Sequence, residues 1–122
     1  MTDNHLDPHD LGRRGETVAA NYLADRGLVL LSRNWRCRDG ELDVVATDGK
    51  ALVVCEVKTR ATDEFGDPAE FVSRDQMTRI RRASHAWLRR YRVGWCEIRF
   101  DVVSILWPTT GTPRLRHLRG AF

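Results

Sequence analysis

The sequence predicts a single α/β domain in which helices flank a mixed β-sheet. With 122 residues, the chain is long enough for one hydrophobic core but too short for two. Two runs rich in Val and Leu surround an Asp-Gly pair within residues 41–58, a pattern that predicts an antiparallel hairpin. Amphipathic helical spacing occurs over residues 10–26 and 73–91. Because the second helix would join the hairpin to a later strand, we expect that strand to pair in parallel.

The first predicted helix follows a polar segment, residues 1–9, which we expect to be a disordered tail. Apolar residues recur at helical spacing from Asp10, a candidate N-cap, to Gly27, which would end the helix. Glu16 borders the apolar stripe of this helix instead of facing water squarely. It could also be a surface residue that pairs with Arg13.

The predicted hairpin follows a first strand over residues 28–34, and its register decides which side chains share a face. If Asp48 and Gly49 form the loop, facing residues have numbers that sum to 97, so Glu41 opposes Glu56. Side chains alternate between the two faces of a strand. One face then carries the charged residues Glu41, Asp43, Glu56 and Lys58. The other face carries Leu42, Val44, Val53, Cys55 and Val57.

Like charges that face each other across a hairpin are destabilising, so the carboxylates on this face require an explanation. The common explanation is a half-solvated sheet whose polar face meets water, with Lys58 offsetting part of the negative charge. A divalent metal explains the residues equally well, because Mg²⁺ binds oxygen ligands from one or two carboxylates together with waters. The pattern alone leaves both explanations open.

The second predicted helix follows a long polar loop, residues 59–70, and carries the densest positive charge of the chain. Ser73 and Gln76 form a capping box at its start. From Gln76 to Val93 the chain contains no acidic residue, whereas solvated helix faces usually mix both signs. We interpret this surface as one that follows a phosphate backbone. Its arginines are Arg74, Arg79, Arg81, Arg82, Arg89, Arg90 and Arg92.

The last predicted strand covers residues 97–106, where Arg99 and Asp101 would pair with each other. Beyond it, residues 108–122 are rich in Arg, Gly and Pro, and we expect a flexible basic tail. Trp35, which lies among arginines before the hairpin, could stack on a nucleic-acid base or pack over the sheet edge.

The composition favours an intracellular protein with an anionic partner. The formal charge is +3 and the sequence pI is near 9.1, a modest basic excess. The three cysteines are widely spaced and include no C-x-x-C pair, so neither a disulfide framework nor a zinc ribbon is indicated. Reduced thiols fit a cytoplasmic location. No run of apolar residues approaches membrane-spanning length and the N-terminus is polar, so we expect neither membrane association nor secretion.

Four short blocks, taken together and in order, resemble a known family. They are GlyArgArgGlyGlu at 12–16, GlyGluLeuAsp at 40–43, GluValLysThrArg at 56–60 and ArgPheAspVal at 99–102. The chain is similar to the YraN-like uncharacterised family of the restriction-endonuclease-like PD-(D/E)xK superfamily, which is related to archaeal Holliday-junction resolvases.

The resemblance implies a restriction-endonuclease-like sandwich over residues 10–107 and a metal-dependent nuclease that hydrolyses phosphodiester bonds in DNA, including branched or structured DNA. The catalytic residues would be Asp43, Glu56 and Lys58. Mg²⁺ or Mn²⁺ would be held by Asp43 and Glu56 with the Val57 carbonyl and Glu16. Glu41, which lies outside the minimal signature, is a secondary candidate ligand. Nucleic acid would contact Arg74, Arg79, Arg81, Arg82, Arg89 and Gln76, the last of which stands where the family usually has a lysine.

Two other functions stay open beside the nuclease. The chain could bind nucleic acid through this fold with little or no turnover, or it could be a protein-interaction domain that uses the 59–70 loop. An intact set of Asp43, Glu56 and Lys58 favours the nuclease, because a non-catalytic protein has no need to retain carboxylates that repel each other. We further expect that the chain could form a homodimer.

Overall fold

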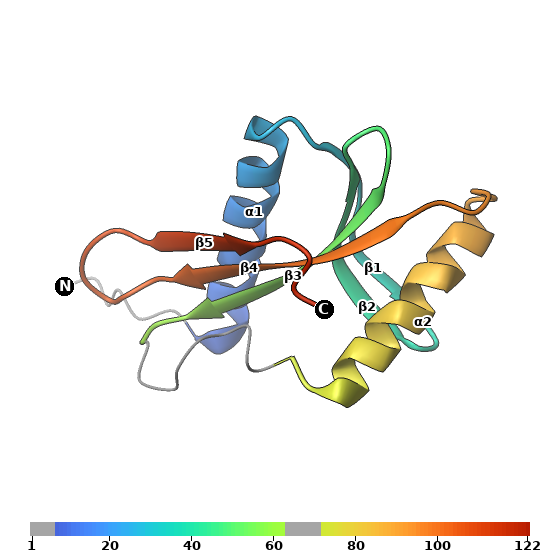
Figure 1. The fold of residues 1–122 in the computed structure, drawn as a ribbon. Helices are drawn as coiled ribbons and strands as arrows, with labels where there is room; N and C mark the ends of the chain where they lie inside the picture. The colour runs from blue at the N-terminus through green and yellow to red at the C-terminus, as the bar shows by residue number, and fades with distance from the viewer. Residues whose placement is uncertain (1–6, 63–71) are drawn as a thin grey trace.

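The computed structural model describes residues 7–62 and 72–122, and it shows a five-stranded mixed sheet with one helix on each face (Figure 1). Most of the loop predicted over residues 59–70 lies outside the described residues. The elements in chain order are α1 (Pro8–Asp25), β1 (Val29–Cys37), β2 (Gly40–Thr47), β3 (Leu52–Arg60), α2 (Arg74–Arg90), β4 (Ile98–Leu106) and β5 (Arg114–Leu118). The α/β class is therefore confirmed.

The strands lie side by side in the order β1-β2-β3-β4-β5. Neighbouring strands are antiparallel except β3 and β4, which pair in parallel along their whole length. The parallel pair follows from the α2 crossover, because a chain that leaves one end of a strand must return to the other end to run in the same direction. The predicted parallel pairing is thus confirmed.

The sheet separates two hydrophobic clusters. The cluster on the α2 side contains Leu42, Val45, Val54, Ile80, Trp87 and Val102, among others. The cluster on the α1 side contains Ala19, Leu23, Val44, Val53, Cys55 and Val103, among others. Because both faces of β2, β3 and β4 are covered, these strands read as nearly continuous apolar runs, as expected for strands at the centre of an α/β sheet.

The two helices differ in how well their ends were predicted. Helix α2 begins as expected, with the Ser73 side chain accepting a hydrogen bond from the Gln76 backbone N–H at 3.1 Å. Helix α1 begins earlier than expected. Its N-cap is Asp7, which accepts from the Asp10 backbone N–H at 2.9 Å, so Asp10 is not the cap. Pro8 at the first helical position suits this start, because its missing N–H would have no partner there anyway.

The hairpin register differs from the prediction by two residues. Thr47 faces Leu52 and Val45 faces Val54, so the facing numbers sum to 99 and the turn spans residues 48–51. Asp48 explains the longer turn, because its carboxylate accepts hydrogen bonds at 2.8 Å from two backbone N–H groups of the turn. Glu41 therefore does not oppose Glu56. It faces Arg36 on β1 instead.

The predicted division of the hairpin into one apolar and one charged face also fails at one point. Leu42 packs in the α2-side cluster and Val44 in the α1-side cluster, although strict alternation would place both on the same face. Strand β2 therefore changes face at Asp43. In β1, the residue between the partners of Leu42 and Val44 is Asn34, whose φ of 50° is left-handed and breaks the extended backbone at the same level.

The carboxy-terminal segment is not the flexible tail that its composition suggested. Residues 114–118 form β5 along β4, and Phe122 stacks on Phe100 with ring centroids 5.1 Å apart. A fully buried carboxylate, Asp101, anchors this segment by accepting hydrogen bonds from His117 at 2.8 Å and from the Gly120 backbone N–H at 3.0 Å. The partners are distant in sequence, so local composition could not reveal them.

Strand β1 extends through Trp35, which was predicted to lie in a connection after residue 34. The Trp35 ring is partly buried against the α2-side cluster and lies 6.5 Å from the Tyr91 ring. Of the two roles considered for Trp35, the structure therefore supports packing on the sheet. No helix in the described ranges 7–62 and 72–122 is long and apolar enough to cross a membrane.

Candidate active site

An open acidic pocket of about 290 Å³ lies where the start of β2 meets the middle of β3, beneath the first turns of α2. Its lining residues are Gly40, Glu41 and Asp43 from β2, Glu56 from β3, and Gln76, Arg79 and Ile80 from α2. The structure thus brings together the two carboxylates, Asp43 and Glu56, that the sequence placed on one face of the hairpin. It also adds Arg79, one of the predicted phosphate contacts.

Asp43 is held at the point where β2 and β3 separate. The last facing pair of the ladder is Val44 with Cys55, and beyond it the Val57 backbone N–H donates to the Asp43 carboxylate at 2.9 Å. Burial and the nearby Glu56 carboxylate together raise the pKa of Asp43 from 3.8 to about 8, against the lowering effect of the Val57 hydrogen bond. Asp43 is therefore a carboxyl group that folding holds mostly protonated at neutral pH in the absence of a cation.

Glu56 has two polar partners on the same oxygen. Its Oε1 atom lies 3.4 Å from the Lys58 ammonium and accepts a hydrogen bond from the Gln76 amide at 3.1 Å. Burial raises the pKa of Glu56 and Lys58 partly offsets this effect. Side-chain exposure is 12% for Glu56 and 23% for Lys58, so water screens this ion pair less than it screens a surface pair. The spacing of two residues places both side chains on one face of β3.

Glu16 approaches the same acids from the opposite helix. Its Oε2 atom is buried without a hydrogen-bond partner, and burial followed by the Glu41 charge raises its pKa. Helix α1 comes close to β3 because Gly15 lies against Thr59, where an added Cβ would overlap the threonine side chain. Gly15, the second glycine of the GlyArgArgGlyGlu block, therefore positions Glu16 beside the acidic residues of the pocket. Among the described residues, Glu16 forms no ion pair with Arg13; the charge of Arg33 lowers the pKa of Glu16 instead.

Glu41 lines the pocket but also turns toward β1. Its carboxylate lies 3.7 Å from the Arg36 guanidinium, and its side chain is 36% exposed. This surface pair is worth little stability, because water screens both charges. Glu41 contributes to the raised pKa values of Glu16, Asp43 and Glu56, so it belongs to the same electrostatic cluster.

These acids do not form a ready-made metal cage. Within residues 7–62 and 72–122, no group of three or more His, Cys, Asp or Glu side chains is arranged to hold a metal ion. The donor chemistry nevertheless fits Mg²⁺, which usually takes one or two carboxylates and keeps several waters. The unpartnered Glu16 oxygen and the raised pKa of Asp43 are the features that a bound cation would relieve. The Val57 carbonyl stays a predicted metal ligand. The Val57 backbone N–H, in contrast, donates a hydrogen bond to the Asp43 carboxylate.

Comparison with known proteins identifies the family. The model of the uncharacterised protein family UPF0102 matches residues 15–105. The chain belongs to this family.

UPF0102 relatives from several organisms cover nearly the whole chain. A UPF0102 protein of Frankia casuarinae is 50% identical over 112 residues, covering 92% of this chain and 95% of the relative. One of Frankia alni is 51% identical, covering 92% and 93%. A third, of Acidothermus cellulolyticus, is 46% identical and covers 92% of each chain. The resemblance to the YraN-like family is therefore confirmed.

The predicted basic surface of this UPF0102 chain divides into parts with different surroundings. Arg79 lines the acidic pocket, and Arg79 and Arg82 together line a shallow groove on the outer side of α2 with Asp75 and Thr78. Arg81 points elsewhere, since its guanidinium lies over the rings of Phe100 and Phe122 at 5.5 and 5.6 Å. Arg74 and Arg89 are exposed.

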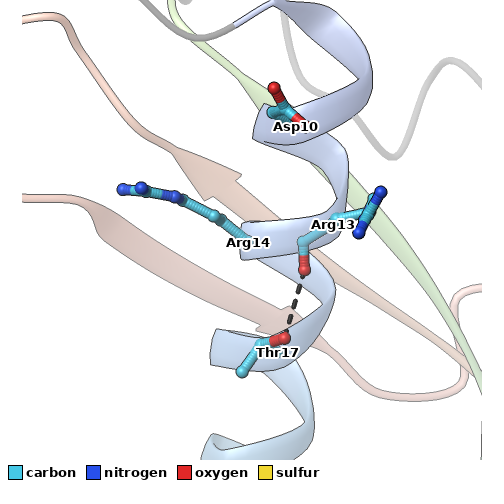
Figure 2. Close-up of a pocket in the computed structure, with 4 residues that line it drawn as sticks. All are labelled: Asp10, Arg13, Arg14 and Thr17. Atoms are coloured by element: carbon cyan, nitrogen blue, oxygen red, sulfur yellow. Dashed lines mark hydrogen bonds between the residues drawn. The ribbon is translucent and has the colours of Figure 1, made fainter. Parts of the chain in front are cut away.

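A second basic surface on α1 was not predicted. A shallow groove is lined by Asp10, Arg13, Arg14 and Thr17, and Figure 2 shows the two arginines pointing to opposite sides of the helix. Arg33 from β1 reaches this groove and donates to the Thr17 hydroxyl at 3.2 Å. The adjacent arginines of the GlyArgArgGlyGlu block were visible in the sequence, but the approach of Arg33 depends on packing between α1 and β1.

Proposed function

We propose that this UPF0102 chain is a metal-dependent nuclease that hydrolyses phosphodiester bonds in DNA, including branched or structured DNA. The observation that carries the proposal is the shared pocket of Asp43 and Glu56, with Lys58 at 3.4 Å from Glu56. Two buried carboxyl groups with raised pKa values destabilise the fold unless a cation or a proton offsets their charge. Such perturbed groups gather at functional sites more often than elsewhere.

The arrangement of elements supports a restriction-endonuclease-like core. In that core, as the sequence resemblance implies, an Asp on one strand and a Glu-x-Lys on the next share one site. Here Asp43 lies on β2, Glu56 and Lys58 lie on the adjacent β3, and β3 pairs in parallel with β4 through the α2 crossover. Fold alone does not establish activity, so the proposal depends on the site residues.

In this proposal, Asp43 and Glu56 hold Mg²⁺ or Mn²⁺, with Glu16, Glu41 and the Val57 carbonyl as further ligands. The metal would supply Lewis-acid polarisation of a phosphodiester oxygen and a lower pKa for the attacking water. Lys58 orients that water and offsets the negative charge that develops on the phosphorus oxygens. Gln76 holds the Glu56 carboxylate in place by its 3.1 Å hydrogen bond.

Phosphate groups next to the scissile bond are bound by α2 in this proposal. Arg79 lines the pocket itself and Arg82 follows it along the helix, which supports these two as contacts for successive phosphates in this proposal. Gln76 is uncharged, so the substrate side of the pocket has one positive charge fewer than it would have with a lysine at this position. Arg81 lies over two phenylalanine rings, so this proposal does not include it among the phosphate ligands.

A second candidate is a nucleic-acid-binding protein with little or no turnover. It is favoured by the Glu56 oxygen being already engaged by both Lys58 and Gln76, and by the lack of a converging three-ligand set within residues 7–62 and 72–122. In this candidate the acidic pocket shapes the binding surface without performing chemistry.

A nuclease assay with matched variants separates the two candidates. Linear, flapped and four-way branched DNA should be cleaved with Mg²⁺ or Mn²⁺ by the wild type, but at least about 100-fold more slowly by Lys58→Ala, which removes the charge that stabilises the transition state. Lys50→Ala is the control, because Lys50 is the other lysine and lies exposed on the β2–β3 turn. Binding in Ca²⁺ should be nearly unchanged in both. DNA binding without cleavage of any substrate would establish the second candidate.

A further inference from the structure

Trp95 is the most exposed large apolar side chain among the described residues. It lies between α2 and β4, and 95% of its surface is accessible. Tyr91 and Val93, just before it, are 47% and 42% exposed. Single apolar residues are common on protein surfaces, but a run of them that includes a nearly bare indole is typical of an interaction site.

The loop that carries Trp95 is fixed at both ends. At the end of α2, the Val93 backbone N–H donates to the Leu88 carbonyl at 2.9 Å and the Arg92 N–H donates to the Arg89 carbonyl at 3.2 Å. These two bonds form a Schellman motif. After Trp95, the Glu97 carbonyl accepts from the Leu52 backbone N–H at 2.9 Å, which ties the loop to β3. The indole is therefore presented to solvent by an ordered loop of few residues.

The backbone conformation of Arg92 is a second notable feature. Its φ is 55°, in the left-handed region where the Schellman position is usually a glycine. A side chain with a Cβ is disfavoured there, so an arginine at this position requires a reason outside the helix cap. Arg89 and Arg90 complement the negative end of the α2 dipole, but Arg92 lies beyond the helix and does not share that explanation.

The charge around Trp95 indicates the kind of partner. Basic residues dominate the approach from α2, where no acid occurs between Gln76 and Val93. The Arg90 guanidinium lies over the Tyr91 ring at 5.5 Å, so a cation and an aromatic face are already combined there. The other charged residues next to the loop in the sequence are Arg89, Arg92 and Glu97. An exposed aromatic ring with flanking arginines matches single-stranded nucleic acid, whose bases stack while its phosphates bind cations.

We propose that Trp95 is a stacking platform for an unpaired base of single-stranded nucleic acid. Arg90 and Arg92 bind the phosphates of the same strand. This inference rests on the proposed nucleic-acid binding and specifies its substrate. From Gln76 at the acidic pocket to Tyr91, α2 advances by roughly 22 Å at about 1.5 Å per residue. A substrate that occupies both sites therefore carries an unpaired segment at that distance from the scissile phosphate, as a flap or a branch does.

Three substitutions at Trp95 test the stacking role. Binding is measured by fluorescence anisotropy in Ca²⁺ with an end-labelled oligothymidylate of about 12 nucleotides, within the usual range of site sizes. Trp95→Ala and Trp95→Leu should weaken binding about 5- to 100-fold, whereas Trp95→Phe should stay within about threefold of wild type, because a phenyl ring still stacks. A blunt-ended duplex of two complementary strands, which has no unpaired bases, should bind all four proteins equally well.

Intrinsic fluorescence supplies an independent readout. The oligothymidylate should quench the tryptophan emission of the wild type, because a base would cover the exposed indole. The quenching should be largely lost in Trp95→Phe although that variant still binds by anisotropy. The other three tryptophans report little direct contact with a base, because Trp87 is buried and Trp35 and Trp107 are partly buried against the two hydrophobic clusters.

The possible results separate this inference from the proposed function. If Trp95→Leu binds as tightly as Trp95→Phe, the site makes an apolar contact suited to a protein partner and stacking is wrong. Equal losses on the oligothymidylate and on the duplex also contradict stacking. Wild-type binding that is indifferent to every Trp95 substitution overturns this inference and leaves the proposed function intact. A wild type that binds neither ligand overturns both.

Discussion

Replacement of Asp43 by Asn should stabilise the metal-free protein, and the size of the gain follows from the pKa of Asp43. That pKa rises from 3.8 to about 8 on folding, because the carboxyl group is buried beside Glu56. The folded state therefore prefers the protonated acid. At pH 7 the unfolded chain releases this proton, whereas the folded chain largely retains it. This difference lowers the free energy of unfolding of the wild type by at most about 4 kcal/mol, at about 1.4 kcal/mol per pH unit.

The stabilisation should depend on pH in a defined direction. A raised carboxyl pKa leaves wild-type stability intact below about pH 4, and stability then falls as the pH rises through the folded pKa of about 8. Asn removes the charge and its side-chain oxygen can still accept the Val57 hydrogen bond. Because Asp43 shares its charge with Glu56 and the strands can relax, we expect a gain of about 2 kcal/mol at pH 7, or about 8 °C in Tm. Near pH 4 the gain should vanish.

Urea denaturation with EDTA at pH 4, 7 and 8.5 measures this gain. The control is Asp25→Asn, because Asp25 is exposed at the end of α1 and its substitution should change stability by less than about 0.5 kcal/mol. Mg²⁺ or Mn²⁺ should then raise the Tm of the wild type but not that of Asp43→Asn, since the cation binds the folded site. A gain that is equal at all three pH values would refute the raised pKa of Asp43, and an equal metal response in both proteins would place the metal elsewhere.

Three further predictions concern packing, the buried ion cluster and phosphate contacts. Gly15→Ala should cost about 1–3 kcal/mol in urea denaturation, because the new Cβ would overlap Thr59, whereas Gly12→Ala, with open space around it, should be neutral or stabilising; equal effects would refute the close approach of α1 to β3. Burial would raise the pKa of Asp101, but hydrogen bonds led by the one from Arg99 hold that pKa below its usual range. Asp101→Asn should therefore lower the free energy of unfolding by about 2–4 kcal/mol at pH 7, and by progressively less as the pH falls below about 4. A loss of stability that grows toward low pH would contradict this. Removing the two guanidinium groups at positions 79 and 82 should reduce the salt slope of DNA affinity by about two units, and an unchanged slope would exclude them as phosphate ligands.

Local sequence signals were sufficient for most of the elements. Periodic apolar residues predicted both helices, and the Asp-Gly turn predicted the hairpin. Both patterns depend only on residues that are near each other in the sequence. The pairing of β3 with β4 in parallel followed from the helix between them. The N-cap at Ser73 was equally local, and its side chain accepts the Gln76 backbone N–H as predicted. The Gln76 side chain, which would complete a capping box, donates to Glu56 instead.

The site could be predicted in part for the same reason. Asp43, Glu56 and Lys58 were placed together from strand alternation, and the two-residue error in register did not separate them because a shift by an even number preserves the face. The error in register did, however, predict that the Glu41 and Glu56 carboxylates face and repel each other, and the structure does not contain that pair. Glu41 faces Arg36 across the β1–β2 ladder, while Asp43 reaches the Val57 N–H beyond the end of the β2–β3 ladder.

The sequence by itself determined the α/β class, the family and the carboxylates that share a pocket, because each depends on short patterns of residues. Tertiary structure decided what those patterns leave open. The face change at Asp43, the approach of Glu16 across Gly15 and the capture of the carboxy-terminal segment by Asp101 all involve partners distant in the chain. The free energy of such contacts comes from burial and charge in the assembled fold, so no local window of sequence contains them.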